Sequence, residues 1–144
     1  MKKFLNDKFT SWENLYQTTK KLVDEKKFSP FIQGGVVAAA VVTEEDNVYY
    51  GINIDSACGW GVCAERNAIF NMFTNGENKI KKVLAVDKNG VLMPCGVCRE
   101  ALMQLDEKSG DIDVLININP LKTIKLKELL SKWWAYDWFK NSRQ

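Results

Sequence analysis

Two stretches decide the fold: Cys63-Ala64-Glu65-Arg66 and, beginning 31 residues after Cys63, Pro94-Cys95-Gly96-Val97-Cys98-Arg99. Each follows a segment that is predicted to be extended, and each opens a segment with helical periodicity, so both cysteine motifs are predicted to start helices. The N-termini of the two helices would converge on one point, where unpaired N–H groups and positive dipole ends favour thiolates. The motifs therefore predict strands alternating with helices around a thiolate site.

The segments around these motifs fit that alternation. We expect helices over 11–27, 63–75 and 95–105 and a terminal helix from Leu126 through Trp134, with strands over 35–43, 48–54, 83–86 and 112–118. Such alternation implies a mixed sheet covered by helices on both faces, which is an α/β fold of the three-layer α/β/α sandwich type. A chain of 144 residues is the size of one domain, so a single domain is predicted over 1–144.

Composition and charge exclude several classes of function. The chain has 20 Lys and Arg against 18 Asp and Glu, and because the basic residues are scattered, no nucleic-acid partner is expected. No apolar run approaches the roughly 18 residues of a membrane span, so no membrane partner is expected either. The absence of histidine excludes a histidine base and a histidine-ligated metal.

The N-terminal residues bear on localisation. The basic start at 1–5 resembles that of a signal peptide, but Asn6, Asp7 and Lys8 interrupt it before an apolar core develops. We therefore expect a cytoplasmic protein. Its four cysteines would stay reduced there, which favours metal ligands over disulfides.

Cys63, Cys95 and Cys98 are the candidate metal ligands. Three sulfurs at this spacing would bind zinc and leave its fourth position to water. Zinc lowers the pKa of such a water from about 15.7 toward 7, but three thiolates return electron density to the metal and weaken this effect. A compensating positive charge is expected nearby, and Arg66 and Arg99 are the candidates for hydrogen-bonding the sulfurs.

Glu65 is the candidate proton carrier, because it lies two residues past Cys63 on the same helix start. A carboxylate beside a metal-activated water can take its proton and deliver it to a ring nitrogen and a leaving amine. That is hydrolytic deamination in outline. The alternative interpretation is a first-turn glutamate that only benefits from the helix dipole.

A structural zinc site is the rival interpretation of the cysteines. Cys58 lies five residues before Cys63 and could complete a closed four-cysteine site without catalytic water, in a protein that is not an enzyme. That arrangement leaves Glu65 and the two arginines without a role, so the open site is favoured. Cys58 is then expected to be a small buried residue.

The two motifs resemble those of the cytidine deaminase family, Cys-Ala-Glu-Arg followed by Pro-Cys-Gly-x-Cys-Arg, at every fixed position, and the resemblance extends over about 28–130. It implies a five-stranded α/β/α fold, one zinc ion per subunit at the three cysteines, and Glu65 as proton shuttle. The implied reaction converts a cytosine nucleoside, cytidine or deoxycytidine, to the uracil nucleoside with release of ammonia, as in pyrimidine salvage. The all-cysteine ligand set is similar to that of small tetrameric members, which implies a homotetramer, and of blasticidin S deaminases.

The substrate contacts match the family less closely. Its pattern Asn-x-Glu-Asn-Ala, which reads the ribose, corresponds here to Asn53-Ile54-Asp55-Ser56-Ala57. By this resemblance Asn53, Asp55 and Ala57 are the expected substrate-binding residues, although Asp55 is a shortened glutamate and Ser56 replaces the second asparagine. These departures leave open a blasticidin S deaminase-like enzyme that acts on a modified cytosine nucleoside.

Two aromatic candidates could cover the substrate. The position of the family's stacking phenylalanine aligns with Gly35, and Phe31, four residues earlier, would reach the ring only if the chain bulges at Gly34-Gly35. Otherwise Phe31 is a core residue. The aromatic run over 133–139 packs the core and a subunit interface, or else lends an aromatic side chain to a neighbouring subunit's pocket.

Overall fold

The computed structural model describes residues 10–142, so the segment discussed as a signal-peptide start lies outside the described residues. Its helices are α1 (Trp12–Lys20), α2 (Ala64–Thr74), α3 (Gly96–Met103), α4 (Leu126–Leu129) and α5 (Trp138–Asn141), with short 3₁₀ turns η2 (Ala57–Gly59) and η3 (Ser109–Asp111). Its strands are β1 (Lys26–Lys27), β2 (Ile32–Thr43), β3 (Val48–Ser56), β4 (Ile80–Asp87), β5 (Gly90–Leu92), β6 (Asp113–Ile118) and β7 (Leu121–Lys125). Over 10–142, no helix combines the length and apolarity needed to cross a bilayer.

The strands form one mixed sheet, as predicted. Its five longer strands run in the order β3-β2-β4-β6-β7, and only β4 and β6 pair in parallel. The short strands β1 and β5 extend it beside β2 and β4, which raises the count from the expected five to seven. Strand β7 is an addition to the predicted strands: Asn119-Pro120, after the strand predicted over 112–118, forms the turn into this antiparallel partner.

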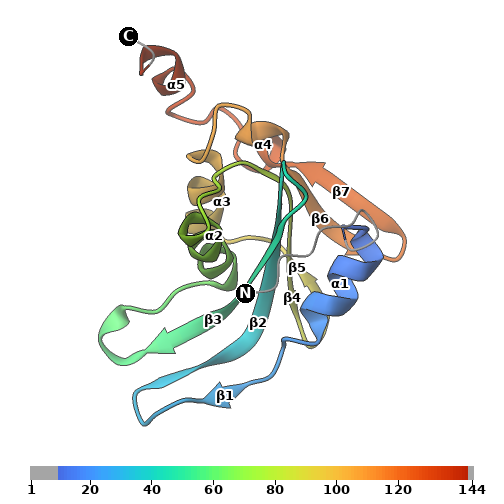
Figure 1. Cartoon of the computed structure of the whole chain (residues 1–144), viewed down its shortest axis with the longest axis vertical. Helices are drawn as coiled ribbons and strands as arrows, with labels where there is room; N and C mark the ends of the chain where they lie inside the picture. The colour runs from blue at the N-terminus through green and yellow to red at the C-terminus, as the bar shows by residue number, and fades with distance from the viewer. Residues whose placement is uncertain (1–9, 143–144) are drawn as a thin grey trace.

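Helices cover both faces of the sheet, which confirms the α/β/α architecture (Figure 1). Helix α1 lies on one face, where Leu15 packs with Ala38, Ala40 and Leu84. Helices α2 and α3 lie on the other face, over a larger core that includes Ile69, Met72, Leu102 and Val114.

Helix α2 is held directly against the edge strand β3. A Cβ atom at Gly51 would lie 2.4 Å from the Ala68 nitrogen, so only glycine permits this approach. Two asparagine side chains of α2 donate hydrogen bonds to carbonyls of β3, Asn67 to Ile52 at 3.0 Å and Asn71 to Tyr50 at 2.7 Å. These contacts fix the position of the helix start that carries Cys63 and Glu65.

The two ends of the chain depart from the expected helices. Helix α1 stops at Lys20 rather than near 27, and the following residues join the sheet, where the Asp24 N–H donates to the Gly35 carbonyl at 2.9 Å. The predicted terminal helix through Trp134 is wrong, because α4 ends at Leu129 and the chain turns at Lys132, whose φ is 52°.

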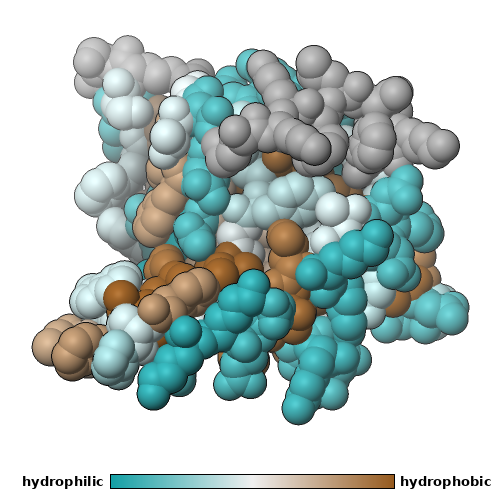
Figure 2. Space-filling view, turned by 60° about the horizontal axis from the view of Figure 1, so that its bottom comes forward, coloured by the Kyte–Doolittle hydropathy of each residue, from teal (hydrophilic) through white to brown (hydrophobic). Residues whose placement is uncertain are grey.

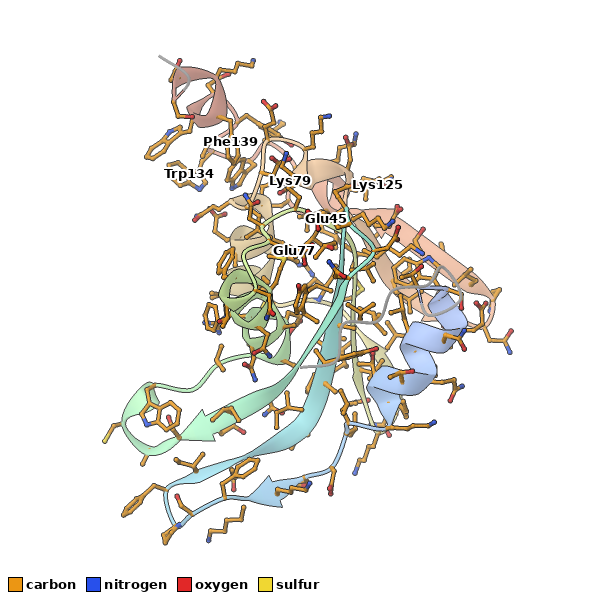
Figure 3. All side chains as sticks on the ribbon, in the orientation of Figure 1. Glu45, Glu77, Lys79, Lys125, Trp134 and Phe139 are labelled. Carbon is orange, nitrogen blue, oxygen red and sulfur yellow. The ribbon has the colours of Figure 1, made fainter. Side chains whose placement is uncertain are left out.

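Tertiary contacts of the aromatic run explain that early stop. Trp133 is buried, and the indole N–H groups of Trp133 and Trp134 both donate to the Glu100 carboxylate at 2.9 Å. Trp134 meets Trp138 edge to face at 5.0 Å, and Trp133 also packs with Phe139 (Figure 3). A continuous helix would spread these rings around its circumference and lose the shared partner Glu100.

Glu77 ties the β2–β3 turn to the end of α2 (Figure 3). Its carboxylate accepts hydrogen bonds from Thr43 at 3.0 Å, from Asn47 at 2.9 Å and from the Tyr49 hydroxyl. Burial opposes ionisation, but these hydrogen bonds outweigh it and hold the pKa of Glu77 below its usual value. Burial and the same hydrogen bond raise the pKa of Tyr49 to about 12.

We predict that Glu77→Gln lowers the free energy of unfolding by about 1–3 kcal/mol, the range for hydrogen bonds to a charged group. Because the folded-state pKa is depressed, the wild-type contribution is present above the unfolded pKa and lost as the pH falls through the folded one. Urea titrations from pH 7 to pH 3 should therefore show the difference between the two proteins shrinking in acid. Glu44→Gln, at an exposed position of the same turn, is the control, and an equal loss in both variants would contradict this assignment.

Candidate active site

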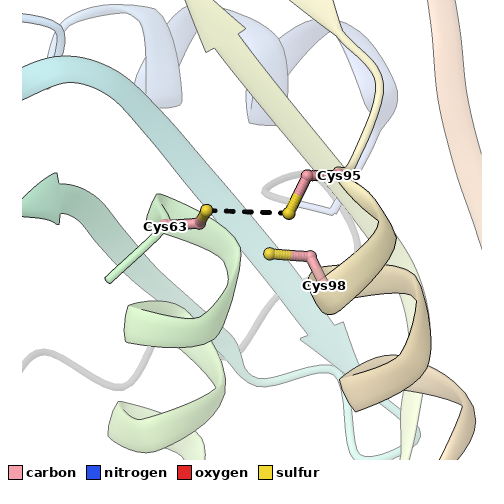
Figure 4. Close-up of side chains that lie close together, drawn as sticks. All are labelled: Cys63, Cys95 and Cys98. Carbon is pink, nitrogen blue, oxygen red and sulfur yellow. Dashed lines mark hydrogen bonds between the residues drawn. The ribbon is translucent and has the colours of Figure 1, made fainter. Parts of the chain in front are cut away.

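Three cysteine sulfurs meet where α2 and α3 begin (Figure 4). Cys63 and Cys95 are the N-cap residues of these helices, and Cys98 lies in the first turn of α3. Their sulfur atoms all lie within 4.8 Å of one another, with Cys63 and Cys95 3.7 Å apart. A tetrahedral zinc ion with Zn–S bonds of about 2.3 Å requires sulfur atoms about 3.8 Å apart. The donor set therefore fits zinc.

Burial and neighbouring polar groups shift the pKa values of the cysteines in opposite directions. Burial disfavours the thiolate of Cys95, yet the N–H groups of Cys98 and Val97 outweigh it and lower the pKa of Cys95. Burial raises the pKa of the Cys98 thiol, so an ion bound there must displace its proton. The Arg66 guanidinium lies 3.5 Å from the Cys63 sulfur and supplies positive charge to the cluster.

Arg99 does not act as expected. Its Nε donates to the Pro94 carbonyl at 2.8 Å, and its Nη1 donates to the Leu129 carbonyl at 3.2 Å. The side chain thus ties the segment that leads into Cys95 to the end of α4, and the predicted hydrogen bond from Arg99 to a cysteine sulfur is replaced by these two. The Leu129 carbonyl is at the C-terminal end of α4, where no helical N–H satisfies it, and the packing of α3 beside α4 brings the guanidinium within its reach.

Glu65 lies beside the sulfurs in the first turn of α2 and is only 5% exposed. Burial raises its pKa above the usual value, against the opposing effects of its own backbone N–H, Cys98 and Arg66. A carboxyl group whose pKa is raised by burial holds a proton more firmly than an exposed glutamate does, which suits a proton carrier.

A pocket of about 550 Å³ opens over Glu65, Cys63 and Cys95. Of the expected substrate-binding residues, Asn53 and Asp55 line it, and the Asn53 amide donates to the Asp55 carboxylate at 3.3 Å. The lining also includes residues outside the predicted site, among them Val37, Leu92 and Met93. The position of Leu92 and Met93 just before Pro94 was the available signal for two of them.

Phe31 and Ala57 do not line this pocket. They border a neighbouring cavity of about 240 Å³ that shares Asp55 and Ser56 with it. The chain does bulge after Gly34, but Phe31 stays 70% exposed. Figure 2 brings this end of the molecule forward and shows hydrophobic surface among hydrophilic side chains. Phe31 and Ala57 are thus separated from the pocket over Glu65, and their contact with substrate stays a prediction.

Cys58 stands apart from the metal cluster. Within 10–142 the cluster of possible metal ligands consists of Cys63, Cys95 and Cys98. Cys58 is exposed rather than buried as expected, and its φ of 66° places it in the left-handed region within η2. A closed four-cysteine site is therefore not what this structure holds.

Comparisons with known proteins give the family. The family model for the cytidine and deoxycytidylate deaminase zinc-binding region matches residues 11–110, which include all three clustered cysteines and Glu65. The chain belongs to this deaminase family. It is a hydrolytic deaminase, which overturns the alternative of a non-enzymatic zinc protein, and its three-cysteine cluster is consistent with one zinc ion per subunit.

Individual relatives agree with this membership. The cytidine deaminase of Mycobacterium tuberculosis is 30% identical over 112 residues, which cover 76% of this chain and 80% of the relative. That of Sporosarcina psychrophila is 34% identical over 94 residues, covering 64% and 68%. The solved cytidine deaminase of Burkholderia pseudomallei superposes with a TM-score of 0.68 at 25% identity, over 85% of this chain and 98% of its own. These deaminases share the fold of this chain.

Substitution of single cysteines tests the ligand set of this deaminase. Cys63→Ser, Cys95→Ser and Cys98→Ser should each lose most bound zinc, because two thiolates hold the ion far less tightly than three. Cys58→Ser should keep about one zinc ion per chain, as the wild type does. Elemental analysis of the purified proteins measures this, and loss of zinc from Cys58→Ser would contradict the three-cysteine assignment.

Proposed function

We propose that this deaminase acts on cytosine nucleosides, cytidine or deoxycytidine, and converts them to the uracil nucleosides with release of ammonia. The observation that carries the proposal is the buried Glu65 beside three clustered sulfurs at the base of the pocket. The relatives described above, which bear the name cytidine deaminase, support the choice of substrate.

Cys63, Cys95 and Cys98 would hold the zinc ion. When bound, zinc supplies Lewis acidity that makes a water molecule nucleophilic near neutral pH. Arg66, through its contact with the Cys63 sulfur, offsets part of the negative charge of three thiolates. Arg99 acts indirectly, because its hydrogen bond to the Pro94 carbonyl positions the segment that leads into Cys95.

Glu65 moves the protons of the reaction. Its carboxylate takes a proton from the attacking water and delivers it to ring nitrogen N3 as the water oxygen bonds to C4. The Glu65 carboxylate then takes the proton of the new C4 hydroxyl and passes it to the amine, the C4–N bond breaks, ammonia leaves and the C4 carbonyl remains. Burial, which raises the pKa of Glu65, favours the protonated form that must persist between these transfers.

Asn53 and Asp55 would bind the sugar hydroxyls. Their mutual hydrogen bond presents a carboxylate and an amide together on one wall of the pocket. This hydrogen bond already restricts the side chain of Asp55, so less conformational entropy is lost when a sugar binds.

The assembly and cellular setting complete the proposal. We propose a cytoplasmic homotetramer that serves pyrimidine salvage and needs neither nucleic acid nor membrane. Exposed apolar side chains of α2, Phe70 and Phe73, and those of the C-terminal segment, Trp134 and Trp138, provide surface suited to contacts between copies.

Replacement of the proton carrier tests the mechanism. Glu65→Gln should keep its zinc and its folded structure but lower kcat by about 10²–10⁴-fold, the usual contribution of general acid–base catalysis. Ammonia release from cytidine, measured with elemental analysis and thermal unfolding on the same samples, checks this. A variant with wild-type turnover would refute the role of Glu65.

A substrate panel tests the specificity. The zinc-loaded enzyme should release ammonia from cytidine and deoxycytidine with a higher kcat/KM than from free cytosine, because Asn53 and Asp55 need a sugar to bind. Blasticidin S in the same assay tests the alternative that the shortened Asp55 suggests. Preference for blasticidin S over both nucleosides would replace the proposed substrate by a modified cytosine nucleoside.

A further inference from the structure

We infer that Val37 and Leu92 form an aliphatic slot that holds the two faces of the substrate's pyrimidine ring. The inference rests on the proposed function and adds the residues that recognise the ring. None of the described residues that line the pocket is aromatic, and Phe31 borders a different cavity. The walls that this chain itself offers to a planar ring are therefore aliphatic.

A bulge in β2 aims Val37 into the pocket. Gly34 pairs with Ile54 and Ala38 with Ile52, so three residues of β2 stand opposite Asn53 alone. Gly35 has φ of 82° at this point, and the Val37 N–H donates to the Asn53 side chain at 2.9 Å. Bulges next to active sites re-aim side chains in this way.

Leu92 lies on the same face of the sheet as Val37, level with Ala39 and so two residues along β2 from Val37. Strand register pairs Ala39 with Ala85 and Ala85 with Leu92, and side chains paired directly across strands share a face. Val37 and Leu92 both pack against the buried alanines 39, 64 and 85. Two branched side chains thus rise on either side of a floor of small residues.

The spacing suits a ring lying between them. Strands β2 and β5 flank β4, which separates them by about 9–10 Å across the sheet, and the two residues from Ala39 to Val37 add about 7 Å along β2, so the two backbones lie about 12 Å apart. Contact with both faces of a planar ring at about 3.5–4 Å per face requires wall atoms about 7–8 Å apart, a gap that remains when a valine and a leucine extend toward each other along this diagonal. Contacts of this kind bind ground state and transition state alike, so they act on KM rather than kcat.

The chain offers matched controls for both walls. Val36, next to Val37, is 41% exposed and does not line the pocket, and Val91, next to Leu92, packs with the core on the α1 face. Val37→Ala and Leu92→Ala should each raise the KM for cytidine about tenfold, the lower end of the effect of removing methyl groups from a substrate pocket, with kcat little changed. Val36→Ala and Val91→Ala should keep the wild-type KM.

Steady-state ammonia release, with zinc content measured for every variant, gives the result. A KM rise confined to Val37→Ala and Leu92→Ala supports the slot, and Val37→Thr, which keeps the side-chain shape, should raise KM as well if Leu92→Ala fails to fold. Unchanged KM in Val37→Ala and Val37→Thr overturns the slot while the proposed function stands. A wild-type enzyme without turnover of any cytosine nucleoside overturns the proposed function, and the slot falls with it.

Discussion

The close contact between α2 and β3 is the constraint on which the rest of the molecule depends. Gly51 lets the helix backbone touch the strand, and Asn67 and Asn71 bond to strand carbonyls. A helix held at two points along its length cannot shift along its axis or rotate without breaking one of these partly buried hydrogen bonds. Because Cys63 and Glu65 stand at the start of this helix, the sheet sets their depth in the molecule.

Helix α3 reaches the same point by a different route. The hairpin β4–β5 leads into Pro94 and Cys95, and the hydrogen bonds of Arg99 to Pro94 and Leu129 fasten that segment from the other side. Two independently fixed helix starts thus place three sulfurs within 4.8 Å of one another. The scaffold, rather than the individual side chains, therefore sets the geometry of the site.

Burial has opposite consequences for the groups at this point. It raises the pKa of Glu65, which suits a group that must carry a proton, and it raises the pKa of Cys98, which disfavours the thiolate that a metal requires. The Arg66 guanidinium opposes the second effect at Cys98, and backbone N–H groups of α3 favour the thiolate of Cys95. The site therefore combines a buried carboxyl group with positive charge and N–H dipoles beside the sulfurs.

The sequence by itself determined the α/β class, the two helix starts and the chemistry of the site, because cysteine spacing, helical periodicity and capping are local properties. Cys63, Glu65, Cys95 and Cys98 meet as their motifs predicted, and the helices after them end within two residues of expectation. Local periodicity gave a wrong prediction where a segment depends on a distant residue. The predicted terminal helix ends early, and Trp133 and Trp134 both donate hydrogen bonds to Glu100.

Tertiary structure alone decided the walls of the pocket. The partners of Arg99, the exposure of Phe31 and Cys58, and the entry of Val37 through a bulge at Asn53 all depend on which backbone groups lie opposite in space. A one-residue change of register reverses the face on which a strand side chain lies, and no periodicity in β2 reports where three residues will stand against one. The reacting groups can therefore be predicted from two short motifs, whereas the walls of the pocket form only when the strands of the sheet pair.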